Sequence, residues 1–389
     1  MIINSQFDSG NIIVKSADTP QDIRLEIRPD NQSEFLQWFH FRVSNVAGVS
    51  LKMTIENAGD AAYVDGWPGY KARASYDRET WFMVDTSFDG QNLIIEHGCE
   101  SDTVWFAYFA PFSMDRHFDL VAWAGQSPIA KNVVLGKTLD GQDLDMIVID
   151  RQDENSVAAE KKLNCWLIAR QHPGESMAEW WMEGVLNTLL DESHPITNEL
   201  LEQCRFYIVP NMNPDGSYRG HLRTNAAGAN LNREWANPTM ENSPEVYLVR
   251  QKMHEMGVDF HMDVHGDEAI PHNFIAGYEA INGLDPDHQA LFDKFEQHLA
   301  TSTPEFQAEA GYPKAQPNSS DMKKCTDYTA GTFKCLAMTL EMPFKDHDNN
   351  HDPVLGWSPV RCGGLAQDCL ASLLSMLPDI KAYKAKISG

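Results

Sequence analysis

The chain has 389 residues and a formal net charge of −25 at pH 7, with 42% hydrophobic and 22% charged residues. A polypeptide of this size can bury the core of one large domain together with a smaller one. The strong negative charge disfavours nucleic acids and anionic membranes as partners, because both are themselves negatively charged.

The sequence also indicates a cellular compartment. It has no apolar run long enough to cross a bilayer, and its first residues lack the basic and apolar regions of a secretory signal. Its seven cysteines are widely scattered and include no C-x-x-C pair, so they do not indicate a disulfide framework. We therefore expect a cytoplasmic protein with reduced thiols.

Residues 1–125 have the pattern of an antiparallel β-sandwich domain. Apolar and polar residues alternate at 39–43, 51–55 and 103–109, and turn-forming residues separate these segments. Short strands with this spacing are typical of two packed sheets. No set of catalytic side chains is apparent here, so we expect a structural or substrate-shaping role.

Residues 126–389 have a different pattern, in which strands alternate with helices. Asp140-Gly141 predicts a hairpin between two strands. Further strands are expected at 165–169, 206–210, 258–264 and 336–342, and helices at 177–190, 245–256, 288–300 and 365–377. The pattern predicts an α/β domain with a mixed, mostly parallel sheet flanked by helices. Ligands bind such sheets beyond the carboxyl ends of the strands.

Three candidate metal ligands follow or end predicted strands. His172 and Glu175 lie three apart in a strand-to-helix turn, although this spacing alone also fits a surface turn. His265 ends a later strand. Zinc accepts such a mixed set of ligands. Asp263 shares a strand face with His265, and it either orients that ligand or is simply a buried, hydrogen-bonded carboxylate.

Two further features indicate chemistry. Arg223 and Arg233 lie ten apart in a loop rich in asparagine, which suits recognition of an anion unless the loop is merely solvated. Glu341 stands alone in an apolar strand, where a carboxylate is costly unless it is paired, ligated or used. Burial would raise its pKa, as a general base requires, although a salt-bridged core glutamate is the alternative.

Taken together, the motifs resemble those of a known family. Five of them occur in the order typical of the M14 zinc metallocarboxypeptidases: His172-Pro173-Gly174-Glu175, Asn213-Pro214-Asp215-Gly216, Arg223 with Asn232-Arg233, Asp263-Val264-His265-Gly266, and Thr339-Leu340-Glu341. The first two forms, with the preceding β-domain, are similar to the cytosolic carboxypeptidase branch. The resemblance implies a carboxypeptidase-like fold for residues 126–389.

The resemblance also implies roles for these residues. His172, Glu175 and His265 would bind Zn²⁺. Glu341 would be the general base that activates the zinc-bound water and later protonates the leaving amine. Arg223 would stabilise the oxyanion of the transition state.

The substrate implied by the resemblance is the C-terminus of a peptide or protein, held at its free carboxylate by Asn232 and Arg233. Some members of this branch trim acidic tails, which suggests a preference for glutamate. The basic candidates for such a preference are Lys323, Lys324 and Lys334, although each is more simply explained as facing solvent.

Some positions do not map cleanly onto the family pattern. The family has a mobile tyrosine between the second zinc histidine and the catalytic glutamate, and this interval contains Tyr278, Tyr312 and Tyr328. Tyr328 lies near the expected place, but the sequence does not decide among the three. Many members also have Asp where this chain has Asn230.

Alternatives remain open at this point. A zinc-dependent N-acyl amino acid deacylase, of the aspartoacylase or desuccinylase type, would share the zinc set and the Asn-Arg pair. A module that binds C-terminal tails without cutting them would typically lack the base or a zinc ligand, and this chain has both. Residues 346–352 are rich in metal-ligand types, but because they are consecutive we expect a solvated loop.

Overall fold

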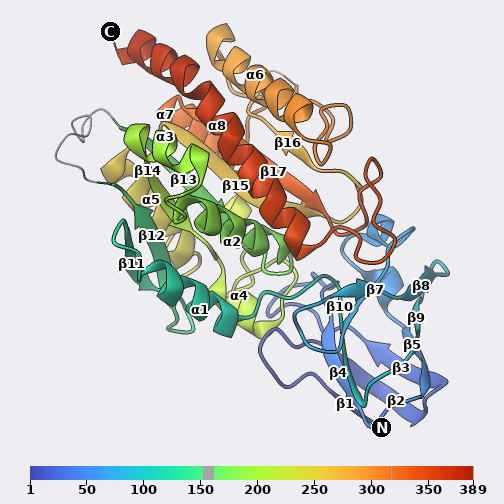
Figure 1. Ribbon diagram of the computed structural model, residues 1–389. Coiled ribbons are helices and arrows are strands. Elements are labelled where there is room, and N and C mark those ends of the chain that lie inside the picture. Colours follow the sequence, from blue (N-terminus) through green and yellow to red (C-terminus); the bar gives the residue numbers. More distant parts are fainter. Residues whose placement is uncertain (152–161, 317, 389) are drawn as a thin grey trace.

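Three β-sheets form the framework of the protein (Figure 1). The computed structural model describes residues 1–151, 162–316 and 318–388. Two five-stranded sheets lie in the N-terminal part of the chain, and a seven-stranded sheet forms the centre of the remainder. No helix in these ranges combines the length and the apolar character that a membrane span requires.

The N-terminal sheets confirm the predicted β-domain. The first sheet has the order β1 (Ile2–Asn4), β4 (His40–Ser44), β10 (Thr103–Ala107), β6 (Arg73–Ser75), β7 (Phe82–Met83). The second has the order β2 (Ile13–Thr19), β3 (Asp22–Glu26), β5 (Ser50–Ile55), β9 (Leu93–Gly98), β8 (Asp85–Phe88). Their strand pairs are antiparallel except that β3 and β5 run parallel.

The seven-stranded sheet is mixed, as predicted. Its order is β11 (Ala130–Lys137), β12 (Asp143–Ile149), β14 (Cys204–Val209), β13 (Leu163–Ala169), β15 (Phe260–Asp267), β17 (Leu336–Pro343), β16 (Phe274–Ala276). The four strands β14, β13, β15 and β17 are parallel, and the strands at both edges are antiparallel to their neighbours. Parallel strands end at one edge of a sheet, so residues from distant parts of the sequence meet there.

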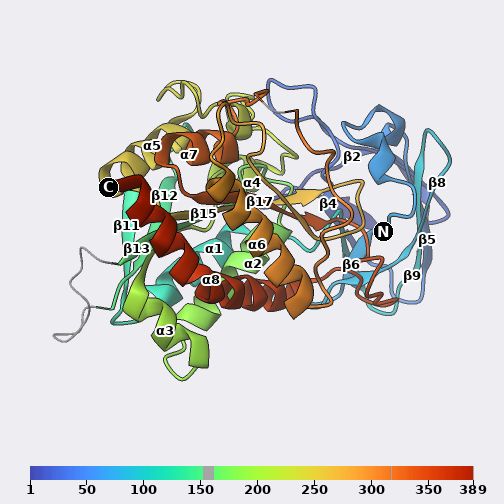
Figure 2. The ribbon, with the colours of Figure 1, turned by 90° about the horizontal axis from the view of Figure 1, so that it is seen from above.

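Helices cover both faces of this sheet. Figure 2 shows α3 (Pro195–Gln203) and α8 (Pro359–Ser388) on one side and α5 (Pro244–Met256) and α7 (Cys325–Phe333) on the other. The remaining helices α2 (Met177–Leu189) and α6 (Pro286–Ser302) both pack against α8. This arrangement explains why the residues of the central strands β13 and β15 are almost all buried, on both faces of the sheet.

The helix α1 (Met114–Ala124) corrects the expectation that residues 1–125 contain only strands. It begins at Ser113, whose side chain accepts a hydrogen bond from the amide of Arg116, and it buries residues spaced three or four apart. It packs against β11 and β12 and against the short helix α4 (Pro214–Arg219). The division of the chain at residue 125 therefore stays a prediction.

The N-terminal domain lies beyond the carboxyl ends of the parallel strands. Phe344, directly after β17, stacks on Tyr108 with ring centroids 4.4 Å apart, and its carbonyl accepts a hydrogen bond from the Arg73 guanidinium. Ligands of such sheets bind at this edge, so the N-terminal domain forms part of the surroundings of any site there.

Candidate active site

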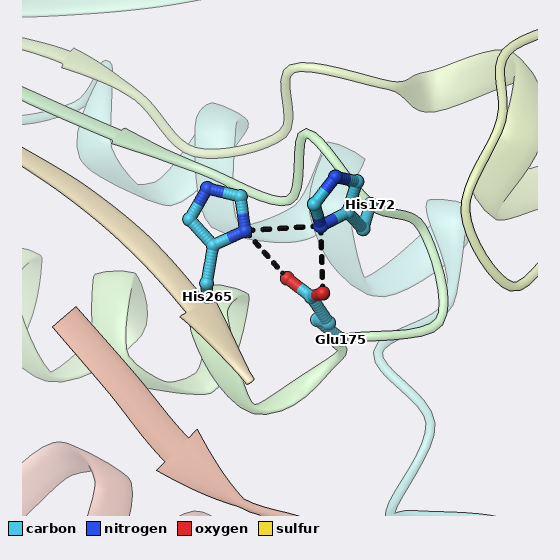
Figure 3. Close-up of side chains that lie close together, drawn as sticks. All are labelled: His172, Glu175 and His265. Atoms are coloured by element: carbon cyan, nitrogen blue, oxygen red, sulfur yellow. Dashed lines mark hydrogen bonds and ion pairs between the residues drawn. The ribbon is translucent and has the colours of Figure 1, made fainter. Parts of the chain in front are cut away.

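The three predicted metal ligands come together at the carboxyl edge of the seven-stranded sheet. His172 and Glu175 lie in the loop between β13 and α2, and His265 lies near the end of the neighbouring strand β15. One possible ligand atom from each lies within 4.8 Å of the others, and all three side chains are buried (Figure 3). In the described residues this is the one group of metal-ligand side chains that converges in this way.

Both imidazoles point the same nitrogen into this cluster. Nδ1 of His172 lies 2.7 Å from Oε1 of Glu175, and Nδ1 of His265 lies 2.8 Å from Oε2 of the same carboxylate. The two Nδ1 atoms are 3.1 Å apart. Two imidazole nitrogens and a carboxylate form the ligand set of several catalytic zinc sites, so these residues fit a zinc ion.

Neighbouring side chains hold each imidazole by its other nitrogen. Nε2 of His265 lies 2.9 Å from Oδ2 of Asp263, and Nε2 of His172 lies 3.0 Å from Oδ1 of Asn230. Each oxygen can accept a hydrogen bond from Nε2–H. The proton then stays on Nε2, and the unprotonated Nδ1 is free to bind a cation. Of the two interpretations of Asp263, the structure therefore supports the orienting one. Asn230, to which the sequence assigned no role, performs the same task for His172.

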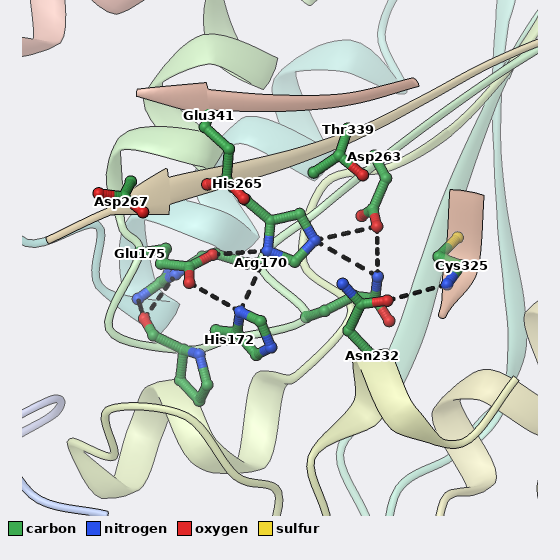
Figure 4. A network of polar contacts seen from close by, with 12 residues as sticks. Arg170, His172, Glu175, Asn232, Asp263, His265, Asp267, Cys325, Thr339 and Glu341 are labelled. Atoms are coloured by element: carbon green, nitrogen blue, oxygen red, sulfur yellow. Dashed lines mark hydrogen bonds and ion pairs between the residues drawn. The ribbon is translucent and has the colours of Figure 1, made fainter. Parts of the chain in front are cut away.

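A hydrogen-bonded chain fixes Asp263 in turn. Its Oδ2 accepts a hydrogen bond of 2.7 Å from the Gln171 amide, and the Gln171 carbonyl oxygen accepts one of 2.9 Å from the Trp235 indole. Figure 4 shows Asp263 beside the His265 ring, on the side away from Glu175. These side chains are all buried, so the position of the His265 ring is determined by several satisfied polar contacts.

The charges in this cluster favour a cation at its centre. Burial lowers the pKa of His172 to about 4. Burial also disfavours the charged form of His265, but the Asp263 and Glu175 carboxylates outweigh it and raise the pKa of His265 well above its usual range. For Glu175, the two imidazoles outweigh burial and lower the pKa. A positive charge is therefore stabilised between these side chains, as a metal site requires.

A second buried network supports the loop that contains His172. The Arg170 guanidinium donates to the Pro173 carbonyl at 2.9 and 3.1 Å and to Oε2 of Glu179 at 2.6 Å. The other oxygen of Glu179 lies 2.6 Å from Nδ1 of His117. Although burial disfavours the imidazolium, the Glu179 and Asp145 carboxylates raise the pKa of His117 to about 9. Two cations thus balance the buried Glu179 and keep Arg170 against the loop.

Glu341 lies beside the cluster, as expected. It is on β17 directly opposite His265 of β15, and it is buried. Burial, followed by the nearby carboxylates of Glu175 and Asp267, raises the pKa of Glu341 well above its usual range, and no partner in the described residues forms a salt bridge with it. The described residues therefore give no support to the alternative of a salt-bridged core glutamate.

Of the three candidate tyrosines, Tyr312 reaches the site. Its hydroxyl lies 3.1 Å from Oε1 of Glu341 and 2.8 Å from Oδ2 of Asp267. The hydroxyl of Tyr328, the candidate that the sequence placed nearest, lies instead 2.7 Å from Nε2 of His254. Tyr278 is buried elsewhere and donates to the carbonyl of His288. Tyr312 lies in an irregular segment, where no periodic pattern could reveal its position.

The N-terminal domain positions the loop around Arg223. Both oxygens of the buried Asp30 accept hydrogen bonds from this loop, from the backbone amides of Leu222, Arg223 and Thr224 at 2.6, 2.8 and 2.9 Å. The Arg223 guanidinium lies over the rings of Phe35 and Tyr63 of the same domain, 5.6 and 5.3 Å from their centroids. The N-terminal domain therefore contributes to the site, as the expected substrate-shaping role implies.

The predicted anion-binding pair lies on another side of the same cavity. The side-chain oxygen of Asn232 accepts a hydrogen bond of 2.9 Å from the amide of Cys325, the first residue of α7. Arg233 is exposed, and its guanidinium donates to the Asn232 carbonyl. Partial desolvation of the Arg233 guanidinium, followed by repulsion from the nearby Arg223 charge, lowers the pKa of Arg233. An anion between these residues would relieve that repulsion.

A single cavity of about 450 Å³ connects these groups. It is lined by the predicted residues His172, Glu175, Arg223, Asn232, Arg233 and Glu341, and also by Tyr63, Glu268, Tyr312 and Lys324. Its volume lies within the usual range of small-ligand pockets. Of the three lysines considered from the sequence, Lys323 and Lys334 do not line it.

The segment 346–352 is no metal site. Asp346 pairs with Arg361 at 3.2 Å and with His351 at 3.1 Å, and most of the segment is solvent-exposed. No three of its metal-ligand side chains come together, as expected for consecutive residues. All seven cysteines are free and buried, which agrees with the prediction of reduced thiols.

Comparisons with known proteins agree with this geometry. Two family models match: the N-terminal domain of cytosolic carboxypeptidases over residues 3–109, and zinc carboxypeptidases over residues 120–353. The chain therefore belongs to the M14 zinc carboxypeptidases, in their cytosolic carboxypeptidase branch.

Individual relatives support the same assignment. An uncharacterized protein of Zymomonas mobilis is 50% identical over 97% of each chain. Cytosolic carboxypeptidase 6 of Homo sapiens is 27% identical over 76% of this chain, which covers 62% of that protein's length. A metallo-carboxypeptidase from Pseudomonas aeruginosa, solved with (2-guanidinoethylmercapto)succinic acid, is 43% identical and has a TM-score of 0.94, with 98% of this chain and 100% of that chain covered.

Asp263→Asn should weaken zinc binding about 10- to 100-fold, because the imidazole of His265 loses the charged acceptor that orients it and raises its basicity. The affinity is measured by competition with a chelator of known zinc affinity, after circular dichroism has verified folding. Asp348→Asn, in the exposed segment 346–352, is the matched control and should bind zinc as the wild type does. Equal affinities for the two variants would contradict the orienting role.

Proposed function

We propose that the protein is a zinc-dependent metallocarboxypeptidase that removes the C-terminal residue of peptides or proteins. The observation that supports this most strongly is the convergence of His172, Glu175 and His265 next to a cavity that His172, Glu175, Glu341 and Arg223 line. Membership of the zinc carboxypeptidases supports the same activity. The names of the cytosolic relatives and the free cysteines support a cytoplasmic location.

In this proposal His172, Glu175 and His265 hold the zinc ion. When bound, zinc lowers the pKa of water and polarises the scissile carbonyl. Glu341 takes the proton from the attacking water and delivers it to the leaving amine. Its buried position and raised pKa suit a base that must both accept and release a proton near neutral pH. The Tyr312 hydroxyl orients the Glu341 carboxylate from 3.1 Å.

Arginine side chains recognise the two anionic groups of the reaction. Arg223 lines the cavity and would donate hydrogen bonds to the oxyanion that forms as the peptide bond is attacked. Asn232 and Arg233 would bind the free C-terminal carboxylate, which restricts cleavage to the last residue. This division of tasks needs a free carboxylate on the substrate, and it therefore distinguishes a carboxypeptidase from an endopeptidase.

The proposal predicts that the zinc-loaded protein removes single residues from peptides with a free C-terminus and leaves C-terminally amidated peptides intact. Mass spectrometry of a mixed peptide pool measures both, together with the preferred last residue. Glu341→Gln should lower the rate at least about 100-fold, because the base is lost.

An absence of trimming by protein that demonstrably contains zinc would refute the carboxypeptidase. N-acyl amino acids would then be the substrates to test, since the alternative deacylase shares the zinc set. Trimming that persists unchanged in Glu341→Gln would refute the role of the base.

We further propose that Lys324 provides any preference for an acidic last residue, since it lines the cavity and the other two lysines do not. Lys324→Glu should lower the ratio of kcat/KM for C-terminal Glu over C-terminal Ala by about fivefold or more, because a like charge replaces the attraction. Lys323→Glu is the matched control at the adjacent position. An unchanged ratio in Lys324→Glu would exclude this residue.

A further inference from the structure

Glu268 is a buried carboxylate that the proposed mechanism does not use. It follows directly after β15, has 6% of its surface exposed, and lines the cavity. Among the described residues no ion pair and no hydrogen bond from another side chain to its carboxylate is found, although its own backbone amide donates to it and the Arg223 charge acts on it. An unpaired carboxylate is costly at this depth, so it calls for a ligand.

The position of Glu268 separates it from the pair that binds the C-terminal carboxylate. The charges that act on it are those of Glu175, Arg223 and Asp267. Its backbone also lies against the N-terminal domain, because a Cβ on Gly66 would come within 3.0 Å of the Cβ of Glu268.

Asn232, in contrast, contacts the first residue of α7. Arg223 is the charged side chain that affects both Glu268 and Arg233, whereas Glu175 and Asp267 act on Glu268, and Asp321, Tyr63 and Tyr312 on Arg233. Glu268 and the Asn232–Arg233 pair therefore lie in different parts of the cavity, with Arg223 near both. If the C-terminal residue of the substrate binds next to Asn232 and Arg233, the part of the substrate before the scissile bond extends toward Glu268.

We propose that Glu268 binds a protonated primary amine of the substrate, on the amino side of the scissile bond. The inference rests on the proposed carboxypeptidase function and narrows its substrate class. The amine is either the α-amino group of a short peptide or the side chain of a lysine in the residue before the cleaved bond. Both place an ammonium group with three hydrogen-bond donors beside the carboxylate.

The surroundings favour an amine over a cation from the protein itself. Arg223 is the cationic side chain whose charge acts most strongly on Glu268. It does not form a salt bridge with Glu268 and lies instead over the rings of Phe35 and Tyr63. Glu175 and Asp267 add further negative charge, so an ammonium group is attracted and an acidic residue at this position is repelled. Burial, followed by the Glu175 charge, outweighs the Arg223 charge and raises the pKa of Glu268 well above its usual range, as expected for a carboxylate that forms no salt bridge.

The test compares three substrates that share the preferred last residue X: Ala-X, acetyl-Ala-X and acetyl-Lys-X. Glu268→Gln should lower kcat/KM at least tenfold for the substrates whose amine binds Glu268, and change acetyl-Ala-X less than threefold. A loss confined to Ala-X identifies the α-amine, and a loss confined to acetyl-Lys-X identifies the lysine side chain. Glu241→Gln, an exposed glutamate that does not line the cavity, is the matched control and should change none of the three.

A second readout does not depend on turnover. In the Glu341→Gln background, the affinity for the amine-bearing substrate is measured by calorimetry with and without Glu268→Gln, and it should fall about tenfold. Equal affinities with and without Glu268→Gln, or a loss of kcat/KM that is the same for all three substrates, would overturn the inference. Cleavage of acetyl-Ala-X by the wild type would still support the proposed carboxypeptidase activity. Failure of the wild type to cleave or bind any of them would overturn the proposed function and this inference together.

Discussion

The structure depends on keeping two imidazoles and a carboxylate buried, close together and correctly oriented at one edge of a sheet. His172, Glu175 and His265 could not remain there without support, because buried polar groups are costly unless their hydrogen bonds are satisfied. Asp263 and Asn230 provide that support from the outer nitrogens of the rings. The cluster is thus prepared for a cation before one binds.

The same constraint explains features that lie farther from the cavity. Arg170 has a left-handed backbone conformation with φ of 60°, and its guanidinium holds the Pro173 carbonyl while Glu179 balances its charge. Such a backbone conformation costs energy in a residue other than glycine, and it persists when the surrounding contacts determine it. These contacts fix the turn between β13 and α2 from which both His172 and Glu175 extend.

None of the residues to which we assign a catalytic role lies in the N-terminal domain, yet this domain contributes to the site. Asp30 accepts hydrogen bonds from three consecutive backbone amides around Arg223, and Phe35 and Tyr63 provide the rings under its guanidinium. A group that stabilises an oxyanion is effective only when it is held in place before the charge develops. In the proposed mechanism, in which Arg223 stabilises the oxyanion, this accounts for a domain packed against the carboxyl edge of the sheet.

Much of this could be predicted from the sequence, because the strongest signals are local. Periodicity indicated the four parallel strands, and the spacing and order of the motifs indicated the residues that line the cavity. The helix α1 was missed within a segment dominated by alternating patterns, although its Ser113 cap is a local signal.

Other features depend on contacts between distant residues. Tyr312 reaches Glu341 from a segment without secondary structure, and Asn230 and Asp30 act on groups far from them in the chain. Glu268 follows His265 closely, but only the structure shows that it lines the cavity and forms no salt bridge with any described residue. Such roles arise from tertiary packing, which no local pattern encodes.

The central claim is that one zinc ion binds between His172, Glu175 and His265, and anomalous diffraction from crystals of the zinc-loaded protein tests it most directly. Data collected on both sides of the zinc absorption edge should give one strong peak per chain, within about 2.0–2.2 Å of an Nδ1 atom of each histidine and of a Glu175 oxygen. A peak at the segment 346–352, or no peak among the three side chains, would contradict the account.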